Sequence, residues 1–253
     1  MKRKLAMAFG GILLAVLAIE GHAVQEQTAS ALMIFDEDTA QCRRVVREYC
    51  AIVQDMAAEK ETNPEKQEKA LTLLRQARSL WSEVMNKWSD SPPREYASDA
   101  AFKARLRDVA NALEDMERAL SVGDARRSFV ACGFGCGLFV TMHEQNGLSY
   151  AVDSLFHLRK TMKSAGAVQK AHGIAKVRPM VGQALRQRDD VLTAPAPWPD
   201  KDERLEPYFE AIRELSRYTD EWALAVQAND VQAAQAAHKE LLIQINRAYG
   251  LAL

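Results

Sequence analysis

The chain has 253 residues, of which 48% are hydrophobic, and its 33 basic and 34 acidic side chains leave a formal net charge of −1. A charge so near balance gives no electrostatic reason to expect binding to nucleic acid or to an anionic membrane surface. The length is enough for one large domain or two small ones.

The first 23 residues predict a secretory signal peptide. Residues 2–4 are basic, residues 5–19 are apolar, and Gly21-His22-Ala23 offers small residues, Gly21 and Ala23, at the cleavage position. The apolar run is shorter than the roughly 20 residues that a membrane-spanning helix needs. We therefore expect export to the periplasm with no stable membrane insertion after cleavage, and a linker at residues 24–37. The alternative is an uncleaved membrane anchor.

From residue 38 onward, apolar side chains recur at helical spacing, and no sustained period-2 alternation predicts a strand. The clearest stripe has alternating steps of four and three residues: Phe102, Leu106, Val109, Leu113, Met116 and Leu120. Such a stripe is typical of a helix that packs in a bundle. We expect an all-α fold with helices at 38–60, 65–88, 98–121, 125–145, 149–168, 178–193, 201–227 and 230–250.

The pattern repeats after about 106 residues. Asp124 and Asp230 each occupy the N-cap position of a final helix, after Gly123 and Asn229 respectively. Apolar positions coincide under the same shift: Val46 with Val152, Met56 with Met162, Leu106 with Ile212, and Met116 with Trp222. The repeat predicts two tandem up-down-up-down four-helix bundles, at residues 38–147 and 148–253. The alternative is one continuous helical array, as in an α-solenoid.

The helix expected at 125–145 is unusual because Gly133, Gly135 and Gly137 lie inside it. Each glycine costs about 1 kcal/mol relative to alanine in a helix interior. Either Gly133 and Gly137 let another helix approach closely, or the glycines leave room for a bulky ligand. The side of this helix expected to face the bundle interior carries Phe129, Cys132, Cys136, Phe139 and His143.

Four cysteines in an exported chain favour disulfide bonds. If the first helix runs antiparallel to the fourth, with Cys42 level with His143, then Cys50 lies beside Cys136. This register predicts a Cys50–Cys136 disulfide. Alternatively, Cys132 and Cys136 lie one turn apart and, with Cys50, would hold a soft metal such as Cu(I) or zinc. Redox-active thiols and buried, unbonded thiols also remain open.

A four-helix bundle whose last helix carries a cysteine pair resembles the cytochrome c-prime family, in which a C-x-x-C-H motif binds haem through both thiols and the histidine. Here three residues separate Cys132 from Cys136, and Gly137 stands in place of the axial histidine. The resemblance therefore implies a cytochrome-type bundle without a covalent haem of the usual kind. A non-covalent haem would need a His/Met pair on facing helices, for which His238 is the candidate; otherwise His238 is a hydrogen-bonded core histidine.

The sequence contains no nucleophile–base pairing and no phosphate-binding loop, so no catalytic residues are predicted. We expect an exported, non-enzymatic protein with a cytochrome-like binding or redox-accessory role. One alternative is an electron-transfer or metal-binding protein that carries haem or a soft metal at Cys132 and Cys136. Another is a structural module that binds a redox or helical protein partner.

Overall fold

A computed structural model describes residues 5–59 and 63–253, with side chains described from Ala31 onward. These residues form eight α-helices and two short 3-10 helices and contain no strand, which confirms the all-α prediction. The α-helices are α1 (Leu5–Ala58), α2 (Pro64–Trp88), α3 (Phe102–Ser121), α4 (Ala125–Gln145), α5 (Ala151–His172), α6 (Arg178–Thr193), α7 (Leu205–Ala228) and α8 (Val231–Leu251).

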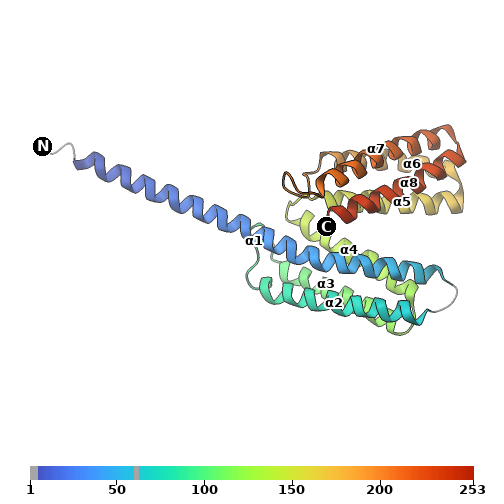
Figure 1. Cartoon of the computed structure of the whole chain (residues 1–253), viewed down its shortest axis with the longest axis horizontal. Helices are drawn as coiled ribbons and strands as arrows, with labels where there is room; N and C mark the ends of the chain where they lie inside the picture. Colours follow the sequence, from blue (N-terminus) through green and yellow to red (C-terminus); the bar gives the residue numbers. More distant parts are fainter. Residues whose placement is uncertain (1–4, 60–62) are drawn as a thin grey trace. The chain divides into compact units, whose positions relative to one another are not determined.

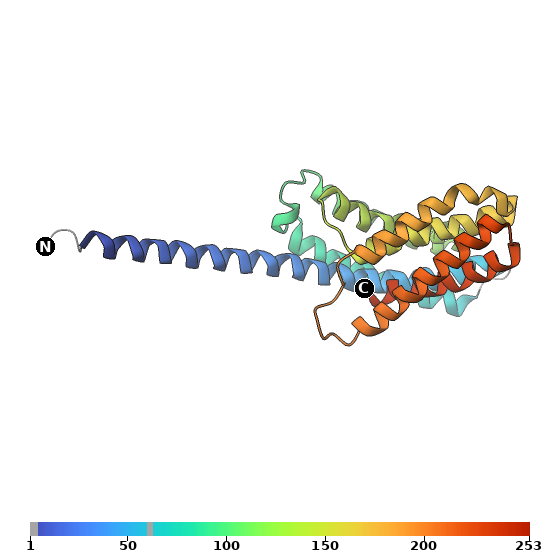
Figure 2. The ribbon, with the colours of Figure 1, turned by 90° about the horizontal axis from the view of Figure 1, so that it is seen from above.

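The first helix is much longer than expected, and the predicted linker at 24–37 is part of it. Phe35 is fully buried, and its ring lies 5.1–5.8 Å from the rings of Trp88, Tyr96 and Phe102. Because this side chain belongs to the core, the helix has to begin before residue 38. The early part of α1 extends past α2 and α3 in both views (Figures 1 and 2).

The predicted signal peptide falls partly outside the described residues. Its basic residues 2–4 are not described, and residues 5–23 are described by their backbone alone, as helix. The signal peptide therefore stays a prediction. Within the described residues, no helix combines the length and the apolar character that crossing a bilayer requires.

The chain forms two compact units, Met1–Gly135 and Cys136–Leu253. The boundary between the units therefore lies within α4 and not at 147–148 as expected. The first half of α4 belongs to the first unit and the second half to the second unit. In the first unit, α2 packs against α1 and α3. In the second, α5 and α7 each pack against both α6 and α8, and the four helices lie alongside one another in both views (Figures 1 and 2).

Helix caps and core positions recur in the two units as the sequence predicts. Asp124 and Asp230 each accept a hydrogen bond from the backbone N–H three residues on, at 2.8 and 3.0 Å. The preceding Gly123 and Asn229 both have positive φ, at 79° and 62°, which ends the helix before each cap. The apolar residues that coincide under the shift of 106 are all buried: Val46, Met56, Leu106, Met116, Val152, Met162, Ile212 and Trp222. The common ancestry of the two units stays a prediction.

Candidate functional site

The predicted cysteine site has a different pairing from the expected one. Cys50 is bonded to Cys132, with their Cα atoms 6.0 Å apart, whereas Cys136 and Cys42 remain thiols. The predicted Cys50–Cys136 disulfide is therefore wrong by one helical turn. Cys42 is buried and donates from Sγ to the carbonyl oxygen of Ala77 at 3.5 Å.

A buried polar cluster beside the disulfide shows how the register between α1 and α4 is set. The hydroxyl of Tyr49 is hydrogen-bonded to that of Ser128, and both reach the carbonyl oxygen of Met116, at 3.4 and 3.0 Å. Burial raises the pKa of Tyr49 to about 12, against the opposing effect of the hydrogen bond with Ser128. These contacts tie α1, α3 and α4 together at one level, and at that level Cys132 lies opposite Cys50.

The glycines of α4 serve different purposes. A Cβ atom on Gly135 would lie 2.6 Å from Cε of Met116, so the end of the Met116 side chain, from α3, fills the space beside this glycine. A Cβ atom on Gly133 would meet nothing within 4 Å, and one on Gly137 would make an ordinary contact with Phe156 at 3.7 Å. Of the two alternatives, close helix packing at Gly133 and Gly137 is therefore not found, and the tightest contact is that of Gly135 with the side chain of Met116.

The disulfide also takes two cysteines out of the predicted metal and haem ligand sets. Cys50 and Cys132 are bonded to each other, so neither offers a thiolate to a metal or a thiol to haem, and Cys136 is left without the other predicted ligands. In the part of the chain that the structure describes, no three His, Cys, Asp or Glu side chains are placed to hold a metal ion.

His238, the predicted haem ligand, is engaged in the second unit. Its Nε2 lies 2.8 Å from the carbonyl oxygen of Met162, to which it donates, and its ring fills the space that a Cβ atom on Gly166 would take. His238 is therefore the hydrogen-bonded histidine that the sequence analysis gave as the alternative. The hydrogen bond uses Nε2, the ring nitrogen that would bind iron.

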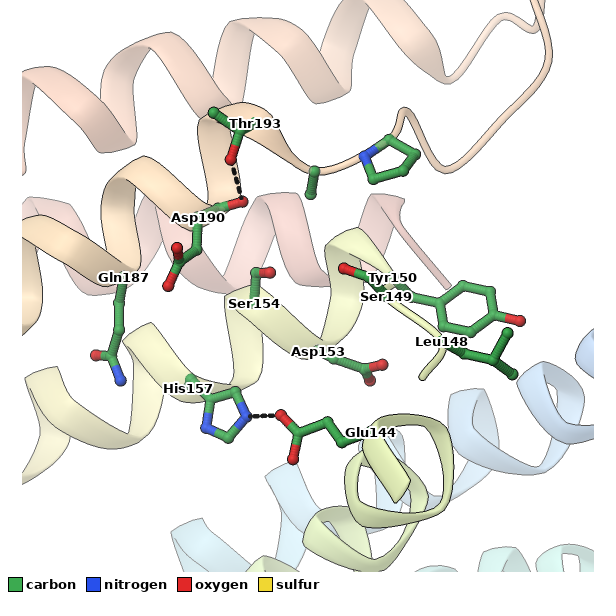
Figure 3. A pocket seen from close by; sticks show the side chains of 12 residues that line it. Glu144, Leu148, Ser149, Tyr150, Asp153, Ser154, His157, Gln187, Asp190 and Thr193 are labelled. Atoms are coloured by element: carbon green, nitrogen blue, oxygen red, sulfur yellow. Dashed lines mark hydrogen bonds and ion pairs between the residues drawn. The ribbon is translucent and has the colours of Figure 1, made fainter. Parts of the chain in front are cut away.

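A polar cavity of about 290 Å³ lies in the second unit. It is bounded by the end of α4, the loop that follows, the first turns of α5 and the last turns of α6 (Figure 3). The lining residues are Glu144, Leu148, Ser149, Tyr150, Asp153, Ser154, His157, Gln187, Asp190, Thr193, Ala194 and Pro195.

A buried histidine holds one of the lining carboxylates in place. Nδ1 of His143 lies 2.7 Å from Oδ2 of Asp153, and the two side chains are only 4% and 6% exposed. Because an ionised carboxylate only accepts hydrogen bonds, Nδ1 is the donor. The imidazole stacks 4.5 Å from the ring of Tyr150, and its Nε2 has no hydrogen-bond partner among the described residues. The sequence predicted that His143 faces the interior, which is confirmed, but it did not identify this partner.

The outer part of the cavity carries two more carboxylates. Glu144 accepts from Nε2 of His157 at 2.7 Å, and this contact is exposed (Figure 3). Asp190, on α6, makes no side-chain hydrogen bond or ion pair to any described residue. No lysine or arginine lines the cavity, so hydrogen-bond acceptors outnumber donors there.

The cavity shows no activated nucleophile. Neither Ser149 nor Ser154, both in its wall, hydrogen-bonds to a histidine within the described residues. The arrangement instead suits a polar ligand that donates hydrogen bonds to fixed carboxylates.

Sequence reasoning missed Glu144, Asp153 and Asp190 because they come from three different helices. The one local signal was Asp153 directly after the apolar Ala151 and Val152 at the start of α5, since a buried carboxylate there requires a partner. Comparisons with known protein families, curated proteins and solved structures found no match.

Proposed function

We propose that this is an exported, non-enzymatic protein of two tandem up-down-up-down four-helix bundles, and that its role is to bind a small polar ligand. The observation that carries the binding role is the cavity of the second unit, whose lining includes three carboxylate residues and no lysine or arginine.

The bundle arrangement is supported by which helices touch. In the second unit each helix from α5 to α8 packs against the next, and α8 packs back against α5, as in a closed four-helix bundle. In the first unit α1 packs on α2 and α2 on α3, while the disulfide and Gly135 bring α4 to α1 and α3. The resemblance to the cytochrome c-prime family rests on this architecture alone.

The ligand class follows from the cavity's chemistry. A volume of about 290 Å³ is at the lower end of the range for small-molecule sites, so the ligand is small. Asp153 is already oriented by His143, and Asp190 has no cationic partner among the described residues. A ligand with a primary amine would supply both the missing positive charge and several N–H donors.

The test is a calorimetric titration of the full chain with a set of small primary amines. Asp190→Asn should weaken binding about tenfold, the value of one charge-assisted hydrogen bond. The matched control is Asp189→Asn, because Asp189 is the next residue but pairs with Arg188 at 2.6 Å and does not line the cavity. Equal effects of the two substitutions, or no binding of any amine, would contradict the proposal.

Export needs a separate test. Cell fractionation of the full chain, followed by N-terminal sequencing of the mature protein, should find it in the periplasm and beginning near Val24. A cytoplasmic protein that begins at residue 1 would refute the proposed location while leaving the binding role open to its own test.

A further inference from the structure

A second cluster of charged side chains lies in the same unit and contains no residue that lines the cavity. Arg159 and Lys163 are one turn apart on α5, so they share a face of that helix, and both are half-buried. The guanidinium carbon of Arg159 lies 5.7 Å from the centre of the Tyr249 ring on α8. The thiol of Cys136, on α4, is close enough to Lys163 to influence it electrostatically.

Arg159 differs from most arginines of this unit because no carboxylate of a described residue pairs with it. Five others pair with carboxylates at 2.5–3.0 Å: Arg188, Arg204, Arg213, Arg217 and Arg247. The Nε atom of Arg159 is shielded from water and has no acceptor among the described residues. A shielded N–H group without an acceptor is costly, so its presence needs a reason.

The charge of Arg159 also acts on Lys163, the cation one turn further along the same face of α5. Burial and, to a smaller extent, the positive charge of Arg159 lower the pKa of Lys163 to about 8, while Cys136 acts in the opposite direction. Two like charges at positions i and i+4 of a helix repel each other. An anion placed between them would relieve that repulsion and accept the hydrogen bond that Arg159 Nε lacks.

We propose that Arg159 and Lys163 form a binding site for the oxyanion group of a small ligand, a carboxylate or a phosphate. The planar fork of the guanidinium presents two parallel N–H donors that match either group, and the ammonium adds a point charge. The ring of Tyr249 flanks the guanidinium and keeps water from one side of it.

The experiment measures binding of inorganic phosphate and of acetate to the full chain at pH 7 by calorimetry, with sodium chloride at matched ionic strength as the reference. Arg159→Gln should weaken binding by at least about tenfold, because it removes charge-assisted hydrogen bonds. The matched control is Lys160→Gln, since Lys160 is a neighbouring, exposed cation on the same helix.

Each outcome either supports or overturns the proposed oxyanion site. Binding of phosphate alone supports a phosphate site, binding of acetate alone supports a carboxylate site, and binding of both supports a general oxyanion site. The proposal is overturned if neither anion binds beyond the chloride reference, or if Lys160→Gln weakens binding as much as Arg159→Gln. If circular dichroism shows that Arg159→Gln does not fold, Lys163→Met takes its place under the same criteria.

Discussion

Replacing Cys50 with serine should destabilise the protein under oxidising conditions and have little effect under reducing ones. The disulfide joins residues that are 82 positions apart in sequence. In the chain-entropy model, opening a loop of that length costs about 4.5 kcal/mol of unfolding free energy. For a chain of this size the loss corresponds to a fall of roughly 10–15 °C in the melting temperature.

The assay is thermal unfolding followed by circular dichroism, with and without dithiothreitol. Cys136→Ser is the control, because Cys136 remains a thiol and its replacement leaves the bond intact. Alkylation of the native protein followed by fragmentation of the tryptic peptide 128–159, which contains both Cys132 and Cys136, locates the unbonded thiol. If Cys136→Ser lowers the melting temperature as much as Cys50→Ser does, or if the alkylated residue is Cys132, the pairing described above is incorrect.

Three further predictions concern the glycines of α4, the titration of Lys163 and the absorption spectrum. Gly133→Ala should raise the free energy of unfolding, measured in urea, by about 1 kcal/mol, since the added Cβ meets only open space. Gly135→Ala should raise it less or lower it, because the Met116 side chain would have to move. Equal gains for the two variants would contradict the packing described. The pKa of Lys163 is lowered from 10.5 to about 8 in the folded state, so between these pH values the unfolded chain holds a proton that the folded chain has released. The free energy of unfolding should therefore rise as the pH increases from about 8 to 10.5. Lys163→Met should abolish that rise, whereas the control Lys160→Met should retain it. The purified protein should show no Soret band in its absorption spectrum, and an observed band would restore the haem interpretation.

Much of the fold could be predicted because helical periodicity is a local property. The spacing of Phe102, Leu106 and Val109 identifies a buried stripe without any knowledge of what packs against it. Asp124 and Asp230 identify helix starts for the same reason, since a cap forms hydrogen bonds within its own first turn. The predicted start of the first helix was wrong. Phe35 belongs to the core only because Trp88, Tyr96 and Phe102 pack against it, and these contacts are not local in sequence.

The sequence by itself therefore determined the helices, their caps and most of the positions that are buried. The tertiary structure decided which atoms meet: Cys132 rather than Cys136 opposite Cys50, and Glu144, Asp153 and Asp190 around one cavity. The physical reason is that periodicity fixes the face that a helix buries but not its axial position against a neighbour. A shift of one turn, about 5.4 Å, leaves the apolar pattern unchanged and replaces one cysteine with another.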